Sequence, residues 1–309
     1  MKKIAVLMGG KSSEREVSLL SGKNVSEALA SLGKYEVVPV DLAEENLDAL
    51  PKDVDAVYIA LHGGWGENGG VQAALNALKI PYTGPGVLAS QIAMDKTKTK
   101  MVLEMKGVPT AKWSIVRLGD CSDCPIPFPV VVKPPKDGSS VGISKCRDID
   151  EFRKGLELAW SVDGKSNNRT IEQSNNEPLA LVEEFIPGRE FTVAVVDGEP
   201  WPVIEIVAKG GWYGYEEKYN SDETKYPFLE DGELAAKMQK IAVDAYRAVG
   251  CRGVTRVDFR VSPLGRCYVL ELNTSPGFTS HSLVPKAGIR TGLTFAGVCD
   301  RILRSAACD

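Results

Sequence analysis

The sequence predicts an α/β protein whose N-terminal part holds an open, mainly parallel β-sheet and whose C-terminal part is α+β. Two observations support this prediction. Short apolar runs alternate with helical patterns through residues 1–95, an order typical of parallel strands joined by helices. Near the C-terminal end, adjacent strands are joined by short turns rich in Gly, Pro or Asp, which predicts antiparallel hairpins.

Residues 1–95 are expected to form the first domain, with three buried strands and two helices. The strands are expected at residues 4–8, 37–40 and 56–61. After the first strand, Ser13 and Glu16 form a capping-box pattern that predicts the start of a helix. A second helix is expected over residues 71–78 because Pro81 follows it.

Two further domains are expected at residues 96–186 and 187–309. In the second domain, strands are expected at residues 129–133 and 179–185. The third domain is expected to start with a hairpin whose turn is Asp197-Gly198, a pair typical of tight turns between strands. The long loop 209–227 is expected to cover an active site, because loops of this length in a compact domain are usually functional.

Composition excludes several classes of protein. At 309 residues, with 25% charged side chains and a net charge of −4, the chain is typical of a globular protein. The charge gives no reason to expect nucleic acid or a membrane as a partner. No stretch approaches the ~18 apolar residues of a membrane span, and the apolar run at 4–8 is shorter than a signal-peptide core. We therefore expect a cytoplasmic protein.

The cysteines and histidines limit which disulfides, metal sites and catalytic groups the chain can have. An odd number of scattered cysteines, seven in all, argues for reduced thiols rather than disulfides. Cys121 and Cys124 form a CxxC, but no second pair has the spacing of a zinc site. With only His62 and His281, a histidine-rich metal centre is excluded. No Gly-x-Ser-x-Gly segment supports a serine hydrolase.

A C-terminal hairpin carries the most informative pattern. Its strands are expected at residues 254–261 and 266–273. Because side chains alternate along a strand, Arg256 and Asp258 share one face, as do Glu271 and Asn273. The oxygens of the last three suit magnesium bound to nucleotide phosphates, and an arginine beside them can stabilise developing charge. The alternative is a hairpin with a solvated polar face, but the polar loop 274–282 that follows favours a site.

Two segments have the appearance of phosphate-binding loops. Residues 5–12 match a relaxed Walker A pattern, but only Gly9-Gly10-Lys11 remain as loop after the strand, too few to surround phosphates. A helix N-terminus that holds an anion or polar substrate is the alternative there. Lys133 followed by Gly-Ser-Ser-Val-Gly at 138–142 offers charge, hydroxyls and N–H groups to phosphate. A flexible surface turn is the alternative for that segment.

Taken together, these segments resemble the D-alanine–D-alanine ligase family of the ATP-grasp superfamily over essentially the whole chain. The matching segments are Gly9-Gly10 with Ser13–Ser18, Ala60–Gly63, Pro81–Gly84, Met94–Lys96, Val132–Pro134 with Gly138–Gly142, Lys218-Tyr219 with Ser221–Thr224, Arg256–Asp258, and Glu271–Gly277 through His281–Pro285. Two departures are Glu67-Asn68-Gly69, where the family more often has Glu-Asp-Gly, and Glu184, where a lysine is frequent.

The resemblance implies an ATP-grasp fold and an ATP-dependent ligase. ATP would phosphorylate the carboxylate of one D-alanine, and the amine of a second would attack the acyl phosphate, giving D-alanyl-D-alanine for peptidoglycan precursors. The implied cofactors are ATP and two Mg²⁺ ions, with Mn²⁺ as a substitute, and the implied assembly is a homodimer. No protein nucleophile is needed, so catalysis would rest on positioning and charge stabilisation.

The resemblance also assigns roles to individual residues. Those that bind nucleotide phosphates are Lys96, Lys133, Ser140 and Lys218. The adenosine site is lined by Glu183, Phe185, Ile186 and Glu190. The metal ligands are Asp258, Glu271 and Asn273. The oxyanion is held by Arg256 and the Gly277 N–H. The substrates are bound by Glu14, His62, Ser282 and Leu283. A network that closes the long loop is formed by Glu14, Ser139 and Tyr219.

Three alternatives stay open at this point. A D-alanine–D-lactate ligase has the same fold, although Tyr219 favours the dipeptide product. Another ATP-grasp carboxylate–amine ligase is disfavoured by the segments around Glu14 and Ser282. A nucleotide-binding module without chemistry is disfavoured because the residues assigned to catalysis are all present.

Overall fold

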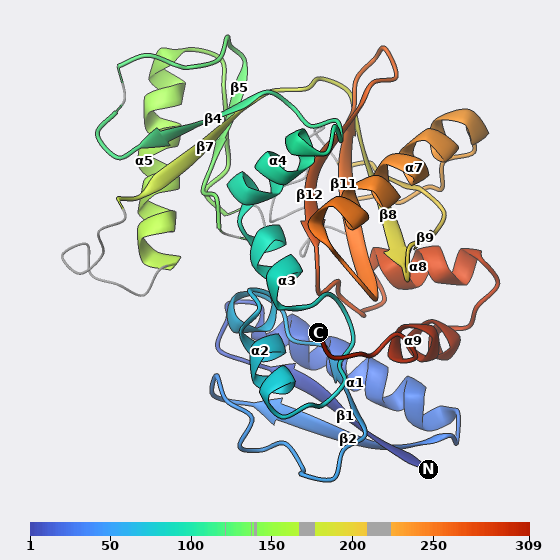
Figure 1. The fold of residues 1–309 in the computed structure, drawn as a ribbon. Coiled ribbons are helices and arrows are strands. Elements are labelled where there is room, and N and C mark those ends of the chain that lie inside the picture. Colours follow the sequence, from blue (N-terminus) through green and yellow to red (C-terminus); the bar gives the residue numbers. More distant parts are fainter. Residues whose placement is uncertain (121, 137, 139–140, 167–176, 209–223) are drawn as a thin grey trace.

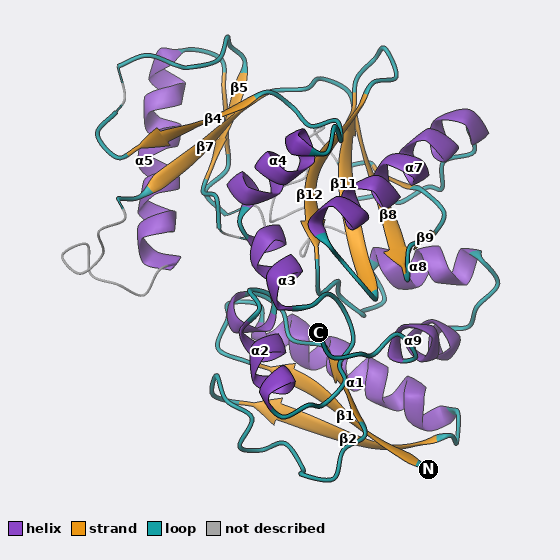
Figure 2. Ribbon diagram, viewed as in Figure 1, coloured by secondary structure: helices purple, strands orange, loops and turns teal. Residues whose placement is uncertain are grey.

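The structure is a computed structural model that describes residues 1–309 except 121, 137, 139–140, 167–176 and 209–223. Within the described residues, the strands form three sheets, and the helices pack around them (Figures 1 and 2). No described helix is both long and apolar enough to cross a membrane. The mixture of a parallel sheet with antiparallel sheets agrees with the predicted α/β and α+β architecture.

The first sheet is parallel, as the alternation of strands and helices predicts. Its strands are β1 (Lys2–Gly9), β2 (Tyr35–Leu42) and β3 (Ala56–Ile59), in the order β2-β1-β3. The central strand is β1, whose residues 4–8 are buried because both neighbours and helices cover it. The helices of this part are α1 (Arg15–Ser31) and α2 (Gly70–Ala77). A short 3-10 helix, η1 (Gly64–Gly66), lies in the connection between β3 and α2.

The start of α1 differs from the prediction. The helix begins at Arg15 with Glu14 at its N-cap, and no side chain caps it, so the predicted capping box of Ser13 and Glu16 is wrong. Gly9 and Gly10 form a turn with φ of 86° and 84°. Ser12, the residue before Ser13, follows this turn. Its Oγ accepts the Glu14 N–H at 3.2 Å. Glu14 occupies the N-cap position, but its side chain does not cap the helix.

The second sheet is antiparallel. Its strands are β4 (Trp113–Arg117), β5 (Val130–Lys133), β6 (Ser144–Cys146) and β7 (Leu179–Glu184), in the order β4-β7-β5-β6. Helix α5 (Ile149–Ser166) covers one face of this sheet (Figure 1). Two helices, α3 (Val87–Met94) and α4 (Lys96–Met105), precede this sheet in the sequence. Between them, the Asp95 side chain accepts the N–H groups of Thr97 and Lys98 and so fixes the start of α4.

The third sheet is also antiparallel and carries the predicted hairpins. Its strands are β8 (Arg189–Val196), β9 (Glu199–Pro200), β10 (Ile204–Ile206), β11 (Val254–Val261) and β12 (Cys267–Asn273), with the main order β10-β8-β11-β12. Asp197 and Gly198 form the turn between β8 and β9 with φ of 52° and 78°, as a tight hairpin requires. The helices of this part are α7 (Gly232–Val249), α8 (Leu283–Arg290) and α9 (Phe295–Leu303).

The C-terminal segment joins the first sheet to the third. Ala307 exchanges backbone hydrogen bonds with Tyr82 at 3.1 and 3.2 Å. Arg252, just before β11, donates from Nη2 to the Ala307 carbonyl at 2.7 Å. The Asp309 side chain accepts the N–H of Val87, the first residue of α3, at 2.8 Å. These contacts hold Tyr82 and the start of α3 close to Arg252, which precedes β11.

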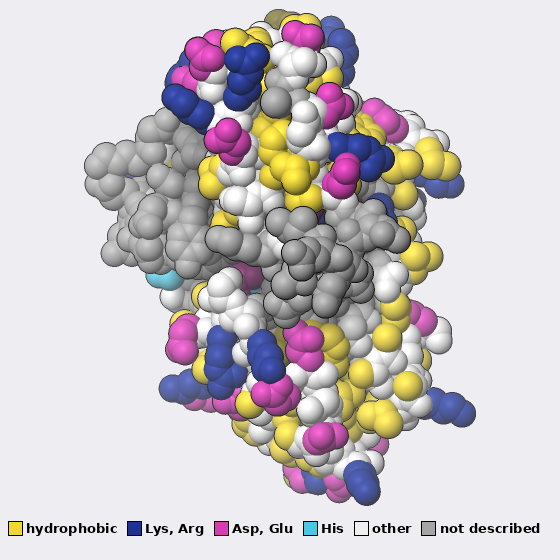
Figure 3. Space-filling view, turned by 90° about the vertical axis from the view of Figure 1, so that its left-hand side faces the viewer, with side chains coloured by type: hydrophobic (Ala, Val, Ile, Leu, Met, Phe, Trp, Pro, Cys, Tyr) yellow, Lys and Arg dark blue, Asp and Glu magenta, His cyan; other side chains and the backbone are white. Residues whose placement is uncertain are grey.

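Charges of both signs are interspersed on the surface. On the face shown in Figure 3, Lys and Arg side chains lie next to Asp and Glu side chains at both ends of the molecule. This mixture agrees with the small net charge of −4. The described part of this face therefore has no extended region of one sign.

Candidate active site

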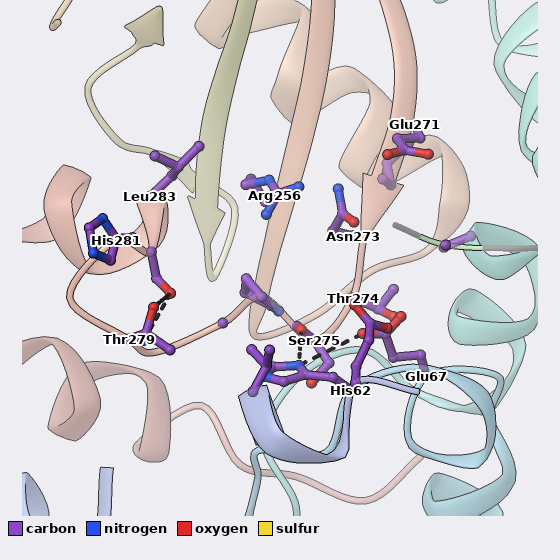
Figure 4. A pocket seen from close by; sticks show the side chains of 18 of the residues that line it. His62, Glu67, Arg256, Glu271, Asn273, Thr274, Ser275, Thr279, His281 and Leu283 are labelled. Carbon is purple, nitrogen blue, oxygen red and sulfur yellow. Dashed lines mark hydrogen bonds and ion pairs between the residues drawn. The ribbon is translucent and has the colours of Figure 1, made fainter. Parts of the chain in front are cut away.

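A cavity of about 410 Å³ lies between the first and third sheets, beside the junction of α3 and α4 (Figure 4). This volume is in the range of small-molecule sites. The lining residues come from seven segments of the chain: Glu14, Glu16, Val17 and Leu20 at the start of α1; His62 and Glu67 after β3; Ala93, Met94 and Lys96; Gly138; Tyr226; Arg256 of β11; and residues 271–277 and 279–283 of β12 and the loop after it.

The hairpin of β11 and β12 places its four predicted polar residues together. The strands pair Arg256 with Asn273 and Asp258 with Glu271. Arg256 donates from Nε and Nη2 to the two carboxylate oxygens of Asp258, at 2.9 and 2.8 Å. Asp258 also accepts from Asn273 Nδ2 at 2.9 Å and from Thr192 Oγ1 at 2.6 Å. The Asp258 carboxylate is thus fixed by three side chains.

The second carboxylate of the hairpin is paired with a lysine from another segment. Lys96, the first residue of α4, lies with its Nζ 3.3 Å from Glu271 Oε2. The lysine is buried, so this pair is only partly screened by solvent. Two cations, Lys96 and Arg256, therefore line the cavity.

A buried ion-pair triad lies between the second sheet and α4. Glu183, at the end of β7, lies 2.9 Å from Lys100 Nζ and 3.0 Å from Lys133 Nζ. Burial alone would raise the pKa of Glu183, but the two lysines reverse this effect and hold its pKa below the ordinary value. Lys100 also donates to Thr110 Oγ1 at 2.7 Å, and that hydroxyl donates to the Val269 carbonyl of β12 at 2.9 Å.

The other residues assigned to adenosine lie where β7 passes into β8. The Lys145 ammonium stacks over the Phe185 ring, 3.6 Å from its centroid. Arg260 of β11 donates to the Ile186 carbonyl at 3.2 Å and to Glu190 Oε2 at 3.1 Å. The arginine therefore fixes two of the predicted residues at once.

The residues assigned to the amino-acid substrates line the cavity, whereas those assigned to adenosine are not among its lining residues. Glu14 packs so closely on the chain after β3 that a Cβ on Gly63 would lie 2.8 Å from its Oε2. Ser282 is the N-cap of α8, and its Oγ accepts the Thr279 N–H at 2.8 Å. Leu283 is the first residue of that helix, where backbone N–H groups have no partner within the helix.

Glu67 is a cavity residue that the sequence analysis did not assign to the site. Its Oε1 lies 3.9 Å from His62 Nδ1 (Figure 4). Burial, and then the nearby Glu14 carboxylate, raise the pKa of Glu67 to about 8. A perturbed carboxylic acid in a cleft is typical of a functional site. Its only sequence signal was the departure at residues 67–69.

Four other residues that contact the predicted site residues were also not identified from the sequence. Lys100 had a usable signal, because it follows Lys96 by one helical turn and shares its face of α4. Arg260, Lys145 and Thr192 had none, since their roles arise from pairing between strands.

Several predicted residues cannot be placed. Ser139, Ser140, Lys218 and Tyr219 lie outside the described residues, as does most of the predicted covering loop 209–227. Of the predicted phosphate loop, Gly138 lines the cavity and Lys133 belongs to the Glu183 triad. The network of Glu14, Ser139 and Tyr219 stays a prediction.

The donor set on β11 and β12 fits a hard cation that arrives with a nucleotide. Within the described part of the chain, no group of three or more His, Cys, Asp or Glu side chains is placed to hold a metal by itself. Asp258, Glu271 and Asn273 offer two carboxylates and an amide on paired positions. Magnesium prefers six oxygen ligands and keeps several from phosphate and water. The chain therefore offers part of a coordination shell, which phosphate oxygens would complete.

The two antiparallel sheets, with lysines on one and the carboxylate hairpin on the other, are those of an ATP-grasp protein, the fold that the sequence predicts. A family model described as D-ala D-ala ligase C-terminus matches residues 102–304, and one described as D-ala D-ala ligase N-terminus matches residues 3–48 and 42–85. The chain belongs to the D-alanine–D-alanine ligase family.

Individual relatives agree with this assignment. A D-alanine–D-alanine ligase of Syntrophotalea carbinolica is 45% identical over 99% of this chain and 96% of that protein. One from Actinobacillus pleuropneumoniae is 40% identical over 99% of this chain and 98% of that protein. The crystal structure of a Bacillus anthracis D-alanine–D-alanine ligase complexed with ATP matches with a TM-score of 0.84 at 32% identity, covering 99% of this chain and 97% of that chain.

Glu67 should make the stability of the ligand-free protein depend on pH. Its pKa is raised from 4.5 to about 8 in the folded state, so the folded protein binds more protons than the unfolded chain between these values. Stability should therefore fall as pH rises through this window. Glu67→Gln cannot ionise, so the melting temperature of the variant minus that of the parent should increase from pH 5 to 8.

The control is Glu157→Gln, which removes an exposed carboxylate on α5. Its melting temperature should follow that of the parent at every pH. Equal pH profiles for the two variants would show that Glu67 does not titrate in this window.

Proposed function

We propose that this protein uses ATP to join two D-alanine molecules into D-alanyl-D-alanine. The observation that carries the proposal is one cavity that is lined by Arg256, the Lys96–Glu271 pair and the N-terminus of α8. Cations and a helix N-terminus suit phosphate and carboxylate groups. Relatives that match almost the full chain are named for this reaction.

The nucleotide would bind between the second and third sheets. Lys96 and Lys133 would hold its phosphates, together with Ser140 and Lys218. Glu183, Phe185, Ile186 and Glu190 would line the adenosine site. What supports this is that both described lysines are buried and already hold carboxylates, so the site is built to pair their charge with an anion.

Asp258, Glu271 and Asn273 would hold two Mg²⁺ ions, for which Mn²⁺ can substitute. When bound, these ions would neutralise charge on the phosphate oxygens and so assist phosphoryl transfer. Thr192 would keep the Asp258 carboxylate oriented, because its hydroxyl donates to Oδ1 at 2.6 Å.

The substrates would bind at the other end of the cavity. Glu14 would accept the ammonium of the first D-alanine, whose carboxylate oxygen attacks the terminal phosphorus of ATP and releases ADP. Ser282 and the Leu283 N–H would take the carboxylate of the second D-alanine. Its amine nitrogen then attacks the acyl carbon, loses a proton, and phosphate leaves. Arg256 and the Gly277 N–H would bind the negatively charged oxygen that develops in this step.

The remaining predictions follow from the same account. His62 lines the substrate end of the cavity, and Ser139, Tyr219 and Glu14 would close the loop 209–227 over it. We propose three domains at residues 1–95, 96–186 and 187–309, with one sheet in each. The resemblance also implies a homodimer and a product used in peptidoglycan precursors, and the composition predicts a cytoplasmic location.

A D-alanine–D-lactate ligase is not favoured. Relatives that are 40 and 45% identical over nearly the full chain are named for the dipeptide. The position that would discriminate the two, Tyr219, lies outside the described residues.

The proposed activity is tested with purified protein, ATP, Mg²⁺ and an equimolar mixture of D-alanine and D-lactate. We expect ADP release that depends on D-alanine, and mass spectrometry should detect D-alanyl-D-alanine as the main product. A protein that binds ATP but releases no ADP with D-alanine would be a binding module. A main product of D-alanyl-D-lactate would instead assign the depsipeptide reaction.

Glu14→Gln tests the first-substrate site. Glutamine keeps the size of the side chain but loses its charge, and a charge-assisted hydrogen bond contributes about 1.5–3 kcal/mol. The KM for D-alanine at the first site should therefore rise by about tenfold or more, with the KM for ATP nearly unchanged. Glu27→Gln, at an exposed position of the same helix, should have parental kinetics. If Glu14→Gln has parental kinetics too, the first-substrate site lies elsewhere.

A further inference from the structure

The hydrogen bonds of His62 define which of its nitrogens carries hydrogen. The buried ring has its Nδ1 3.0 Å from the Ser275 carbonyl oxygen and its Nε2 3.1 Å from Ser21 Oγ. A carbonyl oxygen only accepts hydrogen bonds, so Nδ1 must carry the hydrogen. Burial lowers the pKa of His62, which favours the neutral ring. In that neutral tautomer Nε2 is an acceptor, and the Ser21 hydroxyl must donate to it.

The Ser21 hydroxyl has a second partner on the same loop. Its Oγ accepts the Phe278 N–H at 3.0 Å. The four groups therefore form a directional chain: the Phe278 N–H donates to Ser21, Ser21 donates to His62, and His62 donates to the Ser275 carbonyl. The chain begins and ends on the loop that follows β12, at residues on either side of Gly277.

Other contacts fix the same loop to the first sheet and α1. Asn24 Nδ2 donates to the Phe278 carbonyl at 3.0 Å, and Ser275 Oγ donates to the Leu61 carbonyl at 2.6 Å. The Phe278 ring packs edge-on against Tyr58, with their centroids 5.6 Å apart. Gly277 lies between these anchored positions, where a Cβ would be 3.9 Å from Ser21 Oγ.

We propose that Ser21 is a positioning residue, which holds the Gly277 N–H in place by fixing His62 and Phe278 at once. The inference rests on the proposed function, in which this N–H and Arg256 bind the developing oxyanion. Both ring nitrogens of His62 are used within the protein, so His62 acts through the loop and not by transferring a proton. Ser21 itself is fully buried in α1, so it contacts no substrate.

Ser21→Ala removes both hydrogen bonds of the hydroxyl and leaves the helix position otherwise unchanged. A displaced oxyanion donor should lower kcat by about 10- to 100-fold, since misplacement of about 1 Å can cost 100-fold. The KM for ATP should change by less than about twofold, because the nucleotide binds elsewhere. The matched control is Ser26→Ala in the same helix, whose buried hydroxyl donates only to the Gly22 carbonyl. That variant should keep the parental kcat.

Nitrogen-15 NMR of the imidazole rings provides a readout that needs no substrate. The chain has two histidines, and His62→Gln identifies the signals of His62. In the parent, Nδ1 should be protonated and Nε2 should not. In Ser21→Ala, Nε2 loses its donor and its signal should shift, whereas Ser26→Ala should leave it unchanged.

Three results would overturn the inference. One is a parent His62 that is protonated on Nε2, since the chain of hydrogen bonds would then not exist. Another is a Ser21→Ala kcat equal to that of Ser26→Ala. The third is a parent without ligase activity, which would overturn the proposed function as well, while the NMR signals would separately show whether the chain forms.

Discussion

Pairing of buried and half-buried carboxylates with cations is the constraint on which this site depends. Asp258 is held by Arg256, Glu271 by Lys96, and Glu183 by two lysines. Removing one partner of a buried pair typically costs about 3–5 kcal/mol, because the other charge is left unpaired. The chain thus keeps charged groups inside a folded protein by pairing each carboxylate with a cation, from the same strand for Asp258 and from other segments for Glu271 and Glu183.

The same pairs prepare the cavity for a phosphorylated ligand. A cation that holds a carboxylate in the free protein can hold a phosphate when the carboxylate takes a metal ion. On this account, nucleotide and Mg²⁺ replace existing pairs and do not enter a site of unpaired charge. The loop after β12 completes the arrangement, since contacts from α1 and from Leu61 anchor the residues on either side of Gly277.

Local patterns predicted the parts of the fold that local chemistry determines. Alternation along β11 and β12 was enough to place Arg256 with Asp258, and Glu271 with Asn273, on one face of each strand, whereas the pairing of Asp258 with Glu271 depends on a register shift after Asp258. Asp197-Gly198 predicted its turn. The capping box at Ser13 was wrong because the preceding glycine turn makes Ser12 the partner of the helix start. Several elements were not predicted at all, among them β4, β6, α3, α5, α8 and α9.

What the sequence could not predict arises from contacts between distant segments. Ser21 and Phe278 are 257 positions apart, and no spacing rule connects them. Glu67 has a raised pKa because the fold buries it beside Glu14. Lys100 becomes part of the buried triad only because β7 brings Glu183 to it. Such roles depend on tertiary packing, which periodicity along one element does not report.

The most direct test of the account is the magnesium dependence of nucleotide affinity, measured by calorimetry with a non-hydrolysable ATP analogue. In the parent, saturating Mg²⁺ should tighten binding by about tenfold or more, because phosphate oxygens complete the metal shell begun by Asp258 and Glu271. In Asp258→Asn, most of this gain should be lost, while affinity without Mg²⁺ stays near the parental value. An equal magnesium gain in parent and variant would contradict the exchange of ion pairs for metal and phosphate.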